Sequence, residues 1–217
     1  MLERFIQLLH TDDAGSETLA ETRERLKGSF ALGATRRMTQ LGMVVGSAIN
    51  KLEPLATDTL VYASTFAESR SLESYLDSFP TASPTLFQTS IHPSGAQQAL
   101  IGRQRSLGEV FSHSGVEQMP AQALLTAMLA PAARVILCGG EERGTWLVDF
   151  QSAQDRTFGY ALALTRESGP APLGRLALLS SEETSRLTPA AWFDLLHQRR
   201  ALDGPIALGW RLQLNWS

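Results

Sequence analysis

The feature that most constrains the fold is an alternation of short apolar runs with amphipathic stretches between residues 35 and 165. The runs "DTLVYAST" at 58–65 and "ARVILCGG" at 133–140 are apolar and rich in β-branched residues, which is typical of buried strands. Between such runs the spacing becomes helical, as in residues 35–52, where apolar residues recur at steps of three and four. Short strands separated by helices, followed by strand-rich sequence, predict an α/β domain with a mixed sheet.

Other elements follow from the same patterns and from proline and capping residues. We expect strands at 108–113, 156–165 and 207–216, and helices at 67–79, at 118–130 and from Thr188-Pro189 onward. A helix that starts at Ser83-Pro84 is expected to break at His92-Pro93 and to resume at Ser94. Because residues 16–28 are polar and helix-prone, residues 1–30 are expected to form a helical extension, and residues 31–217 a single domain.

Composition excludes several classes of protein. A net charge of −3 and a pI of about 5.8 argue against a nucleic-acid-binding protein, which would carry a basic patch. The single cysteine, Cys138, excludes an internal disulfide and any multi-cysteine zinc site. No other residues have metal-ligand spacing, and neither a dinucleotide-binding nor a P-loop motif occurs, so we expect no metal and no cofactor. We also find no secretory or membrane-spanning segment, and we expect a cytoplasmic protein.

The segment "FSHSGVEQMPAQALLTAML" at 111–129 is predicted to run from a strand through a tight turn into a helix. In many α/β enzymes such a turn holds a nucleophile at the helix N-terminus, where free backbone N–H groups and the helix dipole activate it. Here the turn offers Ser114, Glu117 and Gln118 but no cysteine. Glu117 is either a carboxylate stabilised by the helix dipole or the residue that replaces a former nucleophile.

Two histidines, His92 and His113, lie near turns that also contain serines. A Ser-His hydrolase that uses Ser94 or Ser114 is therefore one alternative, although the G-x-S-x-G motif is absent. A structural or interface role is the other interpretation for both histidines.

Taken in order, several stretches resemble the amino-terminal half of a β-ketoacyl synthase, which has a thiolase-like fold. The chain is most similar to the short chain-length-factor-like proteins associated with aryl-polyene, type II polyketide and fatty-acid biosynthesis. The most specific stretch is "SPTLFQTSIHPSGAQ" at 83–97, and the resemblance extends over nearly everything after residue 30. It is also carried by "RRMTQLGMVVGSAI", "LVYASTFAESRSLESYLDS", "GVEQMPAQALLTA", "ARVILCGGEE" and the closing "LLHQRRALDGPIALGWRLQLNW".

This resemblance implies a thiolase-like half-fold, with a mixed, mostly five-stranded sheet and helices on its faces. It implies that Glu117, or Gln118 if the register slips by one, occupies the position of the acylated cysteine. Active synthases also take two histidines from their carboxy-terminal half, which we expect this chain to lack. A carboxylate is a poor acyl carrier and repels an enolate, so the chain is expected to have no autonomous condensing activity.

We therefore expect a non-catalytic, ketosynthase-like partner protein. It would pair with itself or with a ketosynthase subunit, and possible further roles include contact with an acyl carrier protein. The candidate pocket or interface residues are Phe87, His92, His113 and Ser114. The alternatives are a small acyl-hydrolase or acyltransferase with a Ser-His pair, and an acyl-carrier-binding protein without a synthase partner.

Overall fold

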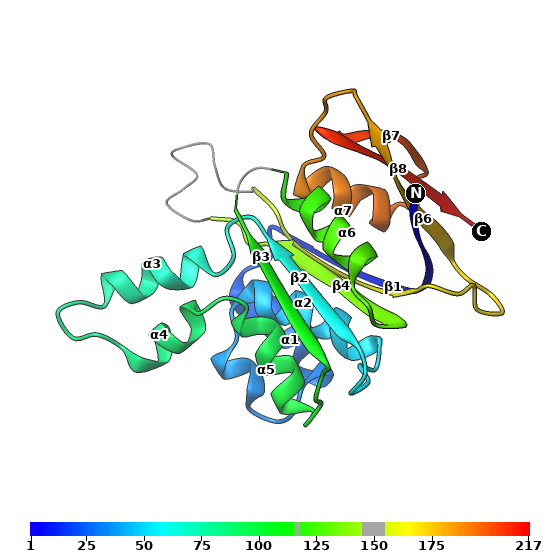
Figure 1. The fold of residues 1–217 in the computed structure, drawn as a ribbon. Coiled ribbons are helices and arrows are strands. Elements are labelled where there is room, and N and C mark those ends of the chain that lie inside the picture. Colours follow the sequence, from blue (N-terminus) through cyan, green and yellow to red (C-terminus); the bar gives the residue numbers. More distant parts are fainter. Residues whose placement is uncertain (116–117, 145–154) are drawn as a thin grey trace.

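The computed structural model describes residues 1–115, 118–144 and 155–217. Its centre is an eight-stranded mixed sheet with the strand order β3-β2-β4-β5-β1-β6-β8-β7 (Figure 1). The strands are β1 (Leu2–Gly15), β2 (Thr59–Ser64), β3 (Glu109–Ser114), β4 (Arg134–Glu141), β5 (Thr157–Thr165), β6 (Gly174–Ser181), β7 (Leu202–Ala207) and β8 (Gly209–Trp216). The predicted mixed α/β class is confirmed, but the five-stranded sheet is wrong, because β1, β6 and β7 also belong to it.

The sheet has a parallel and an antiparallel part. Strands β3, β2 and β4 are parallel to one another, and every later neighbour along the sheet is antiparallel. The parallel strands β2 and β4 are buried on both faces, in agreement with their continuous apolar sequences. By contrast β8 pairs antiparallel with β6 and β7 and buries Leu212 and Leu214 between partly exposed neighbours, which confirms the predicted half-buried antiparallel strand.

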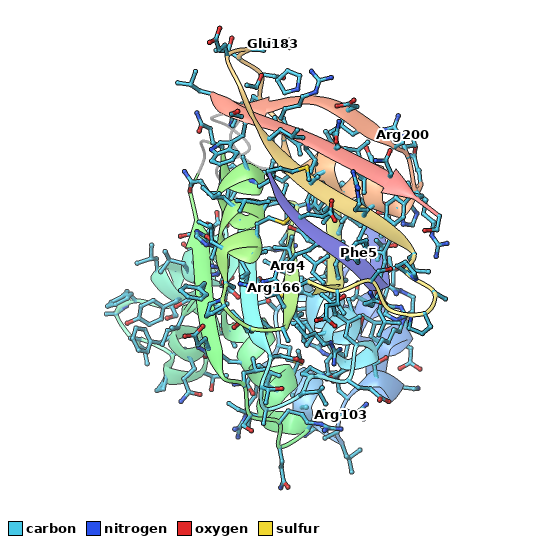
Figure 2. The ribbon with its side chains drawn as sticks, turned by 45° about the vertical axis from the view of Figure 1, so that its right-hand side comes forward. Arg4, Phe5, Arg103, Arg166, Glu183 and Arg200 are labelled. Carbon is cyan, nitrogen blue, oxygen red and sulfur yellow. The ribbon has the colours of Figure 1, made fainter. Side chains whose placement is uncertain are left out.

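The helical extension predicted for residues 1–30 is wrong. Leu2–Gly15 forms β1, which lies between β5 and β6 in the middle of the sheet, and only α1 (Leu19–Leu26) is an α-helix in this part of the chain. The charged residues of this segment do not fit the apolar pattern that is typical of a central strand. One of them, Arg4, is nevertheless fully buried. Its guanidinium donates to the carbonyl oxygens of Ala130 (2.6 Å) and Ala132 (3.2 Å) near the end of α6. Figure 2 shows Arg166 beside it, and Arg166 donates to Ala130 as well.

Helices cover both faces of the sheet and form two apolar cores (Figure 1). One core contains α6 (Met119–Leu129) and α7 (Pro189–His197), and the other contains α2 (Gln40–Lys51) and α5 (Ser94–Gly102). Two short 3₁₀ helices, Lys27–Ser29 and Ala34–Arg37, connect α1 to α2. The hydroxyls of Thr39 and Thr188 cap α2 and α7, and the predicted Thr188-Pro189 start is confirmed. None of the helices in these described ranges is long and apolar enough to cross a membrane.

Two helices, α3 (Ser69–Asp77) and α4 (Pro84–Ser90), form a hairpin that projects from the body of the molecule (Figure 1). We call residues 69–90 the helical arm. The ring of Tyr75 holds the arm together, because it contacts the rings of Phe79 and Phe87, each at a centroid distance of 5.4 Å. The break between α4 and α5 falls at His92-Pro93, as predicted from the sequence.

Candidate functional site

The carboxyl ends of the three parallel strands meet beside the start of α6. In open α/β sheets this end of the strands is where ligands bind. Strand β2 ends at Ser64, β3 at Ser114 and β4 at Glu141, and the Gly115 amide donates to the Thr65 carbonyl oxygen at 3.3 Å. We call this region the carboxyl-end site.

Glu141 closes the end of β4 and is almost completely buried. Its carboxylate accepts hydrogen bonds from the backbone amides of Thr65 (2.5 Å) and Phe66 (3.2 Å) and from the Ser64 hydroxyl (3.2 Å). Burial nevertheless raises the pKa of Glu141 to about 7, because removal from water penalises the charged form more than these bonds favour it. Glu141 therefore fixes the turn that follows β2.

Glu142, the next residue, turns toward α2. Its carboxylate accepts a hydrogen bond from the Leu41 amide at the start of α2 (3.2 Å) and lies 3.6 Å from Nη1 of Arg70. Burial raises the pKa of Glu142 to about 7 as well, against the opposing effects of the Leu41 amide and Arg70. Two successive buried carboxyl groups, Glu141 and Glu142, therefore each have a pKa near neutral pH.

The Glu142→Gln variant is expected to gain stability relative to wild type as the pH rises from 5 to 8. A carboxyl whose pKa is raised from 4.5 to about 7 on folding stabilises the folded chain while protonated, and this contribution is lost as the pH rises through the folded pKa. The relative gain should be about 1–3 kcal/mol, measured by urea unfolding at both pH values. The exposed Glu182→Gln serves as control, and equal changes in the two variants would contradict this assignment.

His92 contacts a third buried carboxylate, Glu68. Nδ1 of His92 lies 2.7 Å from Oε2 of Glu68, whose side chain is fully buried. The other carboxylate oxygen is 3.5 Å from both the Ser94 hydroxyl and the Gly95 amide. On its other side, His92 makes an edge-to-face contact with the ring of Tyr62 at 4.8 Å. Glu68 therefore joins the start of α3 to the start of α5 through the His92-Pro93 turn.

His113 and Ser114 lie at the end of β3, apart from that pair. His113 is half-buried, burial lowers its pKa, and its Nε2 atom has no partner within the part of the chain that the structure describes. Ser114 is exposed. Cys138 is fully buried in β4, and burial raises the pKa of its thiol far above the usual value, so this sulfur is held as the unreactive thiol.

The four predicted pocket or interface residues do not form one cluster. His92 is bonded to Glu68, Phe87 contacts Tyr75 in the helical arm, and His113 and Ser114 sit on β3. Across the described ranges, neither His92 nor His113 is hydrogen-bonded to a serine, which the Ser-His alternative requires.

At the bend before α6, Gln118 adopts a left-handed conformation with φ of 53° and is the N-cap residue. Positive φ is uncommon for a residue with a side chain, and it occurs at sharp turns that present a side chain at a helix N-terminus. Glu117, the other candidate at this bend, lies outside the described residues.

Sequence reasoning missed the three carboxylates Glu68, Glu141 and Glu142. Their signal was present, because Glu141 ends a buried strand, Glu142 directly follows it, and Glu68 follows β2 by four residues. Charged side chains at such positions belong to strand ends that meet in space. Their burial depends on α2 and on the His92-Pro93 turn, which lie far away in sequence.

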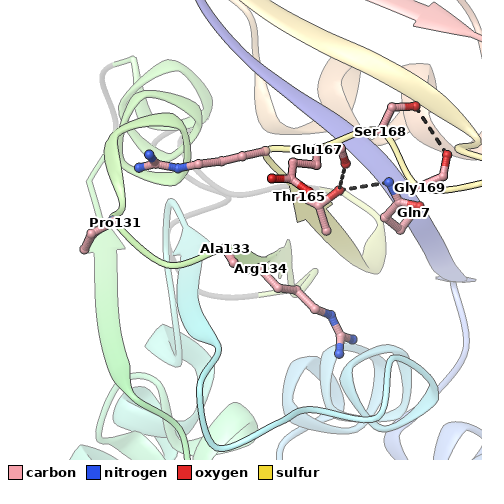
Figure 3. Close-up of a pocket in the computed structure, with 9 residues that line it drawn as sticks. Gln7, Pro131, Ala133, Arg134, Thr165, Glu167, Ser168 and Gly169 are labelled. Atoms are coloured by element: carbon pink, nitrogen blue, oxygen red, sulfur yellow. Dashed lines mark hydrogen bonds between the residues drawn. The ribbon is translucent and has the colours of Figure 1, made fainter.

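A cavity of about 560 Å³ lies at the opposite end of the sheet, where β4 starts and β5 ends (Figure 3). Its polar groups bind one another: Gln7 Nε2 donates to the Thr165 hydroxyl (2.8 Å), which donates to the Glu167 carbonyl oxygen (2.7 Å). No residue of the carboxyl-end site lines it. This cavity therefore does not serve that site.

The sequence matches no family model and no curated protein. Solved structures do match. One chain of a ketosynthase in complex with its chain length factor from Xenorhabdus doucetiae is 21% identical, with a TM-score of 0.67 and full coverage of both chains. The chain has a ketosynthase-like fold. The ishigamide ketosynthase/chain length factor gives a TM-score of 0.58 at 11% identity, covering 83% of this chain and 68% of that one.

A β-ketoacyl synthase from Burkholderia phymatum is also similar, with a TM-score of 0.54, 12% identity and coverage of 92% of this chain and 70% of that one. The predicted resemblance to ketosynthases and chain length factors is thus confirmed at the level of the fold. In this ketosynthase-like chain, the carboxyl-end site and the bend at Gln118 lie together beside the start of α6.

Proposed function

We propose that this ketosynthase-like chain is a chain-length-factor-like partner of a ketosynthase, and that it pairs through β3 and the helical arm. The observation that carries this proposal is the exposed edge strand β3. It lies at the end of the sheet, and among the residues that the structure describes it pairs only with β2. Two of the solved structures with this fold contain a ketosynthase together with a chain length factor, which supports the choice of partner.

Strand β3 has the properties of a pairing edge. Val110 is 54% exposed and Phe111 is 40% exposed, although the two side chains point to opposite faces of the strand. Edge strands of monomers are usually protected by lysine, proline or a covering element. In β3 the one charged residue is Glu109, and no strand within residues 1–115, 118–144 and 155–217 pairs with its outer edge.

The helical arm extends the same surface. Figure 1 shows α3 and α4 projecting beyond the β3 edge of the sheet. The arm and the residue after it expose five large apolar side chains: Leu72, Leu76, Phe79, Phe87 and Ile91. Exposed apolar groups gathered in this way mark interaction surfaces.

For the bend before α6, we propose that Gln118 occupies the position that the acylated cysteine has in condensing synthases. Its positive φ at the start of α6 supports this assignment, whereas Glu117, the first candidate from the sequence, lies outside the described residues. An amide carries no acyl group, so the role of the chain would be to complete the partner rather than to condense. The sequence resemblance supports an aryl-polyene, polyketide or fatty-acid-type pathway, in which an acyl carrier protein would be a second partner.

Mixing the chain with a ketosynthase encoded in the same genome is expected to give a complex in size-exclusion chromatography with light scattering. A Val110→Lys/Phe111→Lys double variant should lose that complex, with at least a hundredfold weaker association, because two charges would be buried in the joined edge. Both positions are exposed, so each monomer should keep its fold.

The control is Leu208→Lys, which places the same charge on a side chain that is 64% exposed at the turn between β7 and β8. This variant should still form the complex. Retention of the complex by the double variant, or a wild-type chain that stays monomeric with its ketosynthase, would contradict the proposal.

A further inference from the structure

A second cavity, of about 280 Å³, lies between α1, the start of α2 and the two helices of the arm. Three arginines from three separate elements line it: Arg23 of α1, Arg36 of the 3₁₀ helix before α2, and Arg70 of α3. The cavity shares the helical arm with the proposed pairing surface, but none of the exposed apolar residues that carry the pairing lines it. Such a convergence of guanidinium groups requires a separate explanation.

The positive charge in this cavity is only partly compensated. Glu142 is the one carboxylate that lines it, and Glu142 already binds the Leu41 amide and Arg70. Arg23 donates from Nε to the Thr35 carbonyl oxygen at 3.3 Å, and its terminal nitrogens have no partner among residues 1–115, 118–144 and 155–217. The Arg36 guanidinium has no hydrogen bond or ion pair within the same ranges, and only its backbone amide is bonded, to the Gly33 carbonyl oxygen. Two guanidinium groups therefore retain free N–H donors at the cavity.

The remaining lining supplies hydroxyls and a small apolar wall. The hydroxyl-bearing residues are Thr39, Ser71, Ser74, Thr85 and Thr89, and the apolar ones are Leu19, Met38 and Leu86. The Ser71 and Thr89 hydroxyls lie 2.6 Å apart, so one of them is held by the other. The Thr85 hydroxyl is without a partner in the described part of the chain, and it adds a further donor beside the arginines.

We propose that this cavity binds the phosphoryl group of a small phosphorylated molecule. Guanidinium groups bind phosphate oxygens in bidentate geometry, and a doubly charged phosphoryl group engages more than one of them, whereas one arginine suffices for a carboxylate. The cavity is larger than the phosphoryl group itself and close to the lower limit for small-molecule sites. Leu19, Met38 and Leu86 then contact the organic part of the ligand.

Calorimetric titration of the full chain at constant ionic strength, in buffer without phosphate, tests this site. The probes are inorganic phosphate and glycerol 3-phosphate. Both should bind saturably. Glycerol 3-phosphate should bind more tightly than inorganic phosphate, because its organic part contacts the apolar wall of the cavity. Arg23→Gln and Arg36→Gln should each raise the dissociation constant about tenfold or more, because each removes a charge-assisted contact. Arg105→Gln, an exposed arginine on the loop after α5, serves as control and should bind like wild type.

Equal affinities for the two probes would overturn the organic part of the proposal. Absence of saturable binding, or equal weakening by Arg105→Gln, would overturn the site itself. Thermal unfolding of each variant without ligand verifies that the fold is retained. None of these results depends on whether the chain pairs with a ketosynthase.

Discussion

The Glu68→Ala variant is expected to lose about 3 kcal/mol or more of unfolding free energy. Its carboxylate is fully buried and holds Nδ1 of His92 at 2.7 Å, and it also faces the Ser94 hydroxyl and the Gly95 amide. Truncation leaves Nδ1 of His92 and the Gly95 amide without this partner and opens a cavity between α3 and α5, whereas the Ser94 hydroxyl keeps the Thr89 carbonyl oxygen at 3.0 Å. An unsatisfied buried donor costs about 1–3 kcal/mol, so the two groups that lose their partner, together with the cavity, account for a loss of this size.

Urea unfolding of Glu68→Ala, Glu68→Gln and His92→Ala separates the contributions. Glu68→Gln retains one acceptor oxygen and should lose less than Glu68→Ala. A double-mutant cycle with His92→Ala then measures the coupling between the two side chains. The exposed Asp77→Ala at the end of α3 serves as control. A Glu68→Ala variant within about 0.5 kcal/mol of wild type would show that Glu68 does not hold the turn.

The elements that could be predicted from the sequence are those determined by a few neighbouring residues. The buried strands β2 and β4 consist of continuous apolar residues, and α7 starts at a capping threonine followed by proline. The break between α4 and α5 was likewise visible at His92-Pro93. In each case a few adjacent residues determine the local structure, so no long-range contact is needed to predict it.

The part that the sequence did not predict depends on contacts between distant segments. Strand β1 contains Glu3, Arg4 and two aspartates, and it became a central strand because β5 and β6 pair with both of its edges. Strand β7 contains Gly204 and Pro205, which weaken a strand pattern, but as an edge strand it tolerates both. Sheet size therefore could not be read from the periodicity of single segments.

The same distinction applies to the candidate site. His92 and His113 were identified from the sequence, because histidines beside turns and serines are visible locally. The environments of the two histidines could not be predicted in this way. Glu68, the partner of His92, lies 24 residues away in sequence, and no serine binds either imidazole within the described ranges. The exposed edge of β3 also required the strand order, which no single segment contains.

The Gly95→Ala variant is expected to lose about 3 kcal/mol of unfolding free energy. Helices α2 and α5 cross with Gly42 and Gly95 in contact, and a Cβ atom on Gly95 would lie 2.1 Å from Cα of Gly42. Since the obstacle is backbone rather than a flexible side chain, the helices must separate, which places the loss at the upper end of the range for overpacked cores. This separation would also disturb the Glu68 contact with the Gly95 amide at the start of α5.

Gly102→Ala is the matched control, because Gly102 lies in the same helix and a Cβ atom there would meet nothing within 4 Å. Alanine has the higher helix propensity, so this variant should be neutral or up to about 1 kcal/mol more stable. Opposite effects of one substitution at two positions of α5 separate helix packing from helix propensity. Equal stabilisation of both variants in urea unfolding would mean that the Gly42–Gly95 contact does not set the distance between α2 and α5.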